Sequence, residues 1–167
     1  VIGFSPALMP FPGLAARLFP ALAKVLFVNP LVPSIFARMA RLPGETERFL
    51  YRATNSRIDA AGLRCYATLL GNSGHCAGAL AMMANWDLAA LRDRLPKVEV
   101  PVLLAHGSRD NAVPLDSVRN ACRLLPRAEL KLLEGLGHLA HEEQPDQAVQ
   151  LIVDFAAMHG IRPLEGA

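Results

Sequence analysis

Cysteines are few in this sequence, and no pattern pairs them. Cys65, Cys76 and Cys122 are an odd number among 167 residues, and none belongs to a C-x-x-C pair. Small secreted domains usually carry more cysteine, at the spacing of a disulfide framework. We therefore expect a reducing, cytoplasmic compartment.

The sequence also has little excess of charge of either sign. Lys and Arg number 17 against 15 Asp and Glu, which gives a net charge of +2, and no run of like charge exceeds two residues. Neutralising a nucleic-acid backbone requires a clustered basic face, so nucleic acid is not an expected partner. With 52% hydrophobic residues in 167, the composition predicts about one globular domain with a buried core.

A native start and an uninterrupted apolar run are both missing. The chain begins at Val1 and not at a methionine, so we expect a fragment of a longer protein. Its first residues do not show the charged segment followed by an apolar segment that is typical of a signal peptide, so we expect none. The most apolar stretch, residues 14–36, is interrupted by Arg17, Lys24 and three prolines. A spanning helix needs about 20 apolar residues. We expect no transmembrane segment, but an apolar helical surface compatible with peripheral membrane contact.

The chain divides into three parts by pattern. Residues 1–9 resemble the remnant of a core strand, 10–95 an Ala/Leu/Arg-rich helical cap, and 96–167 an α/β core. Within the last part, the sequence predicts a buried strand over 98–105, a helix over 116–125, a strand over 129–133 and an amphipathic helix over 144–158. This alternation predicts an α/β fold with parallel strands and crossover helices.

Asp110 and His138 follow the two predicted strands of the core. The carboxyl ends of parallel strands meet at one edge of a sheet, so residues 28 positions apart can become neighbours there. An Asp in this place can accept the Nδ1 proton of a His and stabilise the imidazolium that forms when the His deprotonates a nucleophile. Taken singly, Asp110 could cap a turn and His138 could be a surface residue; the shared context favours a catalytic pair.

Two motifs carry a family resemblance. Residues 106–110 (HGSRD) with Val113-Pro114, and residues 135–138 (GLGH) with 141–145 (HEEQP), resemble the closing half of the α/β-hydrolase fold. In that fold the triad order is nucleophile, acid, histidine. The resemblance implies Asp110 as the triad acid, His138 as the triad base, a strand after the nucleophile at residues 1–4, and an absent N-terminal half of the sheet.

Three longer segments resemble a narrower family. The chain is similar to the magnesium chelatase accessory proteins of bacteriochlorophyll biosynthesis in three segments. These are FSPALMPFPG from residue 4, GHCAGALAMMANWDL from residue 74 and GLGHLAHEEQP from residue 135. This resemblance implies a role at magnesium insertion, with chelatase subunits as partners.

No nucleophile is evident in the chain. Residues 74–78 (GHCAG) fit G-x-C-x-G, but a nucleophile elbow needs a preceding strand and these residues follow a helical pattern, so we interpret Cys76 as a small buried thiol at a helix start. No serine lies in G-x-S-x-G. We expect the nucleophile before Val1, which would leave this chain alone catalytically silent.

No metal site or cofactor is predicted. His138, His141, Glu142 and Glu143 lack the i, i+4 histidine spacing of a zinc helix, and the two glutamates are expected to open the last helix instead. The cap is rich in apolar residues, most of them expected in the core: Phe11, Leu14, Leu18, Phe19, Leu22, Leu26, Phe27, Ile35, Phe36, Met39, Met82, Met83 and Trp86. A subset could line a pocket for a hydrophobic small molecule such as a tetrapyrrole.

Two other functions remain open. One is a general hydrolase, either a serine esterase or an epoxide hydrolase or haloalkane dehalogenase type. The other is a non-catalytic assembly or tetrapyrrole-binding protein that keeps the hydrolase scaffold, because a fold does not determine a function.

Overall fold

A computed structural model describes residues 1–10, 29 and 31–161. Its described part contains a parallel sheet in the order β1 (Ile2–Phe4), β2 (Val102–Gly107) and β3 (Ala128–Leu133). Every residue of β2 is buried, as expected for a central strand covered on both faces. The predicted α/β fold with parallel strands is confirmed.

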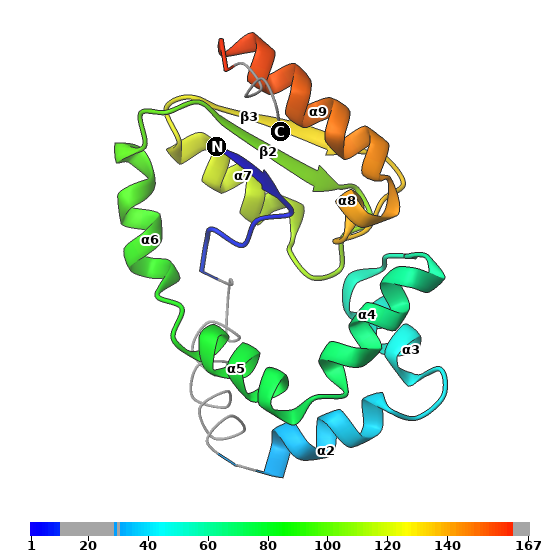
Figure 1. Ribbon diagram of the computed structural model, residues 1–167. Helices are drawn as coiled ribbons and strands as arrows, with labels where there is room; N and C mark the ends of the chain where they lie inside the picture. The colour runs from blue at the N-terminus through cyan, green and yellow to red at the C-terminus, as the bar shows by residue number, and fades with distance from the viewer. Residues whose placement is uncertain (11–28, 30, 162–167) are drawn as a thin grey trace.

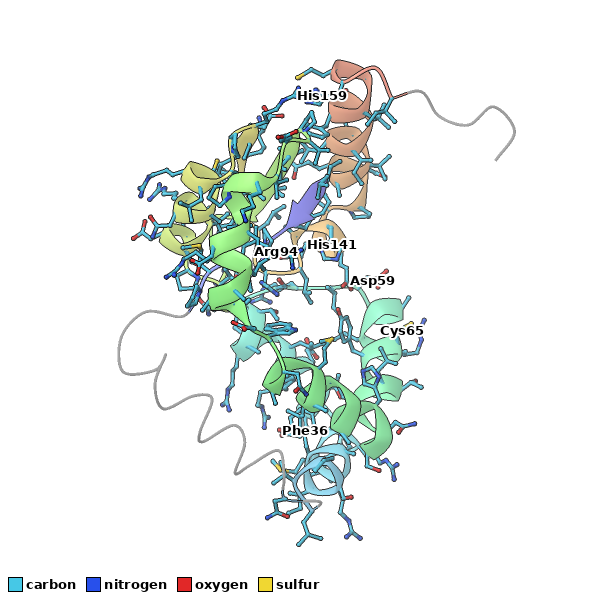
Figure 2. All side chains as sticks on the ribbon, turned by 90° about the vertical axis from the view of Figure 1, so that its left-hand side faces the viewer. Phe36, Asp59, Cys65, Arg94, His141 and His159 are labelled. Carbon is cyan, nitrogen blue, oxygen red and sulfur yellow. The ribbon has the colours of Figure 1, made fainter. Side chains whose placement is uncertain are left out.

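Helices cover both faces of this sheet. Helix α7 (Leu115–Leu124) connects β2 to β3 on one face, and α9 (Pro145–Met158) lies on the other face (Figure 1, Figure 2). Because side chains alternate along a strand, Val102 and Leu104 pack with Val118 and Ala121 of α7, while Ala105 packs in a second cluster with Leu133. The sheet is therefore the middle layer of three.

A helical insertion separates β1 from β2 in the sequence. We use this name for residues 31–84, which form α2 (Leu31–Ala40), α3 (Glu45–Thr54), α4 (Ala60–Leu70) and α5 (Ser73–Ala84). Asn72 caps α5 and Asp59 caps α4 through their side-chain oxygens. In Figure 1 the insertion lies beyond the carboxyl ends of the strands, and in Figure 2 Phe36 and His159 mark opposite ends of the molecule.

The chain returns from the insertion to the sheet through α6 (Leu88–Arg94) and a short 3₁₀ turn (Leu95–Lys97). Leu91 and Leu95 pack against the cluster of β2 and α7. The predicted strand over 98–105 begins later, at Val102, where the backbone amide first bonds across to Arg127. Pro101 directly before it has no amide hydrogen to contribute to the ladder.

One expectation about packing is wrong, and a second is not met at several described residues. Glu142 and Glu143 belong to a separate one-turn helix, α8 (Ala140–Glu143), and do not open α9. Among the apolar residues expected in the core, Ile35, Met39, Met82, Met83 and Trp86 are exposed. Helix α2 buries Pro33 and Ala37 and α5 buries Cys76, while Ile35 and Met39 of α2, Met82 and Met83 of α5, and Trp86 after α5 remain exposed. The apolar residues expected between 11 and 27 lie outside the described residues.

Across the part of the chain that the structure describes, no helix is long and apolar enough to cross a membrane.

Candidate active site

The site forms where the three parallel strands end. Ser5 follows β1, Asp110 follows β2 after a short turn, and His138 follows β3. All three strands end at the same edge of the sheet, which is the edge that faces the helical insertion (Figure 1). Open parallel sheets bind their ligands at this edge.

The carboxylate of Asp110 has two separate functions. Its Oδ1 accepts hydrogen bonds from the backbone amides of Ala112 at 2.7 Å and Val113 at 2.9 Å, which closes the turn after β2. Its Oδ2 lies 2.9 Å from Nδ1 of His138. The side chain is fully buried. Capping a turn and holding a histidine, which the sequence posed as alternatives, are both present in one residue.

The imidazole of His138 is oriented by this contact. An ionised carboxylate only accepts hydrogen bonds, so Nδ1 is the protonated nitrogen, and in the neutral ring the lone pair is on Nε2. The side chain is 28% exposed, and Nε2 makes no hydrogen bond to any described residue. The structure thus brings the two predicted residues together, with the basic nitrogen available to a reactant.

Asp110 stays ionised despite its burial. Burial alone would raise the pKa of this carboxyl, but the hydrogen bonds from His138 and from the Val113 amide outweigh it and lower the pKa below its ordinary value. The nearby Ser5 hydroxyl contributes in the same direction without making a hydrogen bond of standard geometry. An ionised acid at neutral pH is what a histidine base requires as its partner.

Sequence reasoning missed two buried neighbours of this carboxylate. His106 at the end of β2 is 1% exposed, and its Nδ1 lies 3.6 Å from Asp110 Oδ2. Burial lowers the pKa of His106 although the Asp110 carboxylate opposes this, so the ring is neutral at pH 7. Ser5 is also buried, at a positive φ of 45°. A polar residue within an otherwise apolar strand was the available signal for His106; none marked Ser5.

The loops after β2 and β3 are bonded directly to each other. Ser108 donates its amide to Leu133 and accepts the amide of Gly135 on its hydroxyl, both at 2.9 Å, and Arg109 donates its amide to Leu136. At Gly107 a Cβ atom would lie 2.1 Å from the carbonyl oxygen of Gly137. Only glycine permits this approach, which brings the acid and the histidine within hydrogen-bond reach.

Other sequence candidates lie elsewhere. Cys76 is buried at the start of α5, where its thiol donates to the Leu70 carbonyl, and burial raises the pKa of the thiol. It is a structural thiol, as interpreted from the sequence. His141 contacts Phe4 and Glu142 and does not join His138 and Asp110. Within residues 1–10, 29 and 31–161, no three His, Cys, Asp or Glu side chains gather as a metal site would require.

Sequence comparison gives a match to a family and a relative that is similar over most of this chain. The model described as "Alpha/beta hydrolase family" matches residues 2–151. The magnesium-chelatase 30 kDa subunit of Rhodobacter capsulatus is 39% identical over 159 residues, which are 93% of this chain and 54% of that protein. A non-heme chloroperoxidase of Streptomyces lividans is 36% identical over 78 residues, or 46% of this chain and 28% of that protein. The chain spans about half the length of the first relative.

Solved structures agree on the fold. An esterase from Thermogutta terrifontis superposes with a TM-score of 0.62 at 18% identity, covering 94% of this chain and 55% of that one. An esterase from Exiguobacterium antarcticum superposes with a TM-score of 0.59 at 16% identity, covering 83% of this chain and 48% of that one. At these identities the likeness is one of architecture.

Proposed function

Since this chain belongs to the alpha/beta hydrolase family, we propose that it is part of a magnesium chelatase accessory protein in bacteriochlorophyll biosynthesis, in which Asp110 and His138 act as acid and base. The observation that carries this proposal is the 39% identity to the magnesium-chelatase 30 kDa subunit, which extends over 93% of the chain. In this proposal residues 10–95 are the cap and residues 96–167 belong to the core.

The chemistry of the site follows from its hydrogen bonds. His138 Nε2 would accept a proton from a nucleophile or a bound molecule, and the Asp110 carboxylate, 2.9 Å from Nδ1, would stabilise the imidazolium that results. The chain contains no G-x-S-x-G. The group that gives up the proton is therefore proposed to come from outside these 167 residues or from the ligand.

An apolar ligand is supported by the helical insertion. Helices α2, α3 and α4 form an open pocket of about 360 Å³, whose lining includes Phe36, Met39, Phe49 and Leu70 as well as Arg48 and Arg52. This volume is within the range of small-molecule sites. We propose a hydrophobic small molecule here, with a tetrapyrrole as the leading candidate, and peripheral membrane contact through exposed apolar residues of α2 and α5.

The proposal is tested by a magnesium-insertion assay. Chelatase subunits are supplied with a porphyrin and magnesium, and the appearance of the magnesium porphyrin is followed by fluorescence with and without the full-length protein. We expect a higher initial rate with the protein present, and the subunits should be retained on the immobilised protein. An unchanged rate together with no retained subunit would overturn the accessory role.

Ligand binding needs its own experiment. We expect a porphyrin to bind the full-length protein more tightly than a short-chain ester does, and Phe49→Ala to weaken porphyrin binding because Phe49 lines the pocket. Ile35→Ala is the matched control, since Ile35 is also an exposed apolar residue of the insertion but is outside the lining. Equal affinity for the porphyrin and the ester would contradict the assignment.

A general hydrolase is the second candidate, and the buried Asp110 with its hydrogen-bonded His138 is the observation that favours it. A fluorophosphonate probe reacts covalently with an activated serine. Labelling of the full-length protein that disappears in His138→Ala would support a serine hydrolase. Absence of labelling would favour the accessory role or an aspartate nucleophile.

A further inference from the structure

Three consecutive residues of the helical insertion bond to the two loops that carry the acid and the histidine. The Thr54 carbonyl accepts the amide of His138 itself at 2.9 Å. The Asn55 side-chain amide donates to the Arg109 carbonyl at 2.8 Å, one residue before Asp110. The Ser56 hydroxyl accepts the amide of Leu139 at 2.8 Å, one residue after His138.

Two of the three residues, Thr54 and Ser56, are buried, while the bond from Asn55 to Arg109 lies at an exposed position. Thr54 and Ser56 are 8% and 4% exposed, and the Ser56 amide donates to the Thr54 hydroxyl, which itself donates to Leu50 within α3. A Cβ at Gly137 would lie 2.5 Å from the Asn55 carbonyl oxygen and 2.5 Å from the Ser56 hydroxyl. The histidine loop and the insertion are therefore in backbone contact, and a lost hydroxyl there would leave a buried amide unpaired.

The backbone of Asn55 is also unusual. It ends α3 with φ at 54°, in the left-handed region that only glycine adopts without cost and that asparagine tolerates better than most residues. This conformation directs the chain from α3 across both loops. Strained residues of this kind persist where the surrounding structure over-determines them.

Two further contacts hold the same boundary. Glu143 accepts the Gly137 amide at 2.7 Å on one oxygen and the Arg57 amide at 3.2 Å on the other. Tyr66 of α4 donates its hydroxyl to Glu142 at 2.7 Å. The acidic residues of α8 thus connect the insertion to the histidine loop.

We propose that Asn55 and Ser56 are positioning residues, which hold the Asp110 and His138 loops at the separation where the imidazole keeps its proton on Nδ1. They act through the loops and touch neither side chain of the pair. This role rests on the proposed function, in which Asp110 and His138 act as acid and base. Its readout is the tautomer of His138, so it succeeds or fails independently of any activity.

The test is nuclear magnetic resonance of the full-length protein with ¹⁵N-labelled histidine. Asn55→Gly keeps the left-handed backbone without strain and removes only the amide, and Ser56→Ala removes only the hydroxyl. In each variant we expect the low-field Hδ1 signal of His138 to be lost, and its Nδ1 and Nε2 shifts to converge as the two tautomers mix. The signals are assigned by their absence in His138→Gln.

Matched controls separate positioning from simple destabilisation. Asn85→Gly removes an asparagine that also ends a helix and also donates to a backbone carbonyl, and Ser73→Ala removes an exposed hydroxyl of α5. Both should keep the His138 signals of the wild type. If Asn55→Gly and Ser56→Ala lower the melting temperature but leave the Hδ1 signal and both nitrogen shifts unchanged, the residues are structural only and the proposal is wrong.

Discussion

At the scale of single residues, the site depends on one carboxylate that is buried and yet charged. The two oxygens of Asp110 are committed to different partners, the turn after β2 and the imidazole of His138. The hydrogen bond from His138, which helps to lower the pKa of Asp110, also fixes the tautomer of the histidine. The closure of the turn and the orientation of the histidine therefore depend on the same group.

Asp110→Asn tests this charge. Hydrogen bonds to a charged group contribute about 1.5–3 kcal/mol, so we expect the variant to lower the free energy of unfolding by about that amount at pH 7. Because the pKa of Asp110 is lower in the folded state, its contribution is complete above its ordinary value of 3.8 and is lost as the pH falls through the folded value. The difference in the free energy of unfolding between wild type and variant should therefore become smaller at acidic pH. Urea unfolding repeated at several pH values measures this.

The control for this experiment is Asp116→Asn. The Asp116 side chain is 85% exposed, so this variant should change the free energy of unfolding by less than about 0.5 kcal/mol at pH 7. If Asp110→Asn also changed the free energy of unfolding by less than about 0.5 kcal/mol, the buried charge would make no measurable contribution to stability.

At the scale of elements, two glycines allow the acid loop, the histidine loop and the insertion to meet. Added Cβ atoms would collide with backbone at Gly107 and with the Asn55 backbone and the Ser56 hydroxyl at Gly137. We expect Gly107→Ala and Gly137→Ala each to lower the melting temperature and to weaken the Hδ1 signal of His138. Gly78→Ala is the control, because nothing lies within 4 Å of its added Cβ and alanine stabilises a helix interior by about 1 kcal/mol relative to glycine.

The central strand is the element on which both core clusters depend. Leu104 of β2 is 1% exposed and packs against α7. Leu104→Ala should lower the free energy of unfolding by about 2–5 kcal/mol, measured by urea unfolding, because it leaves a cavity that the sheet cannot close. Leu69→Ala, at a position 44% exposed, should cost far less. Equal costs at both positions would mean that the sheet is not the stabilising core.

Periodicity and turn residues made most of these elements predictable from the sequence. The helices predicted over 116–125 and 144–158 and the strands predicted over 98–105 and 129–133 were visible as local patterns, with boundaries displaced by a few residues. The Asp110 and His138 contact could be predicted because both residues follow parallel strands. The role of Glu143 could not be predicted, since its carboxylate bonds to the Gly137 and Arg57 amides that only the tertiary fold brings near.

At the scale of the whole molecule, the sheet and the helical insertion meet around one site. The strands end toward the insertion (Figure 1). Residues 54–56 bond across to both loops. The position of the acid and the histidine relative to the insertion is therefore set by hydrogen bonds and by backbone contact.

The most direct test of the account is the initial rate of magnesium insertion with His138→Ala in place of the wild-type protein. We predict that the variant loses the acceleration that the wild type gives, while the exposed His75→Ala control retains it and both variants melt cooperatively. A His138→Ala protein that accelerates insertion as well as the wild type would show that the pair is an unused part of the scaffold, and the chain would then act through binding alone.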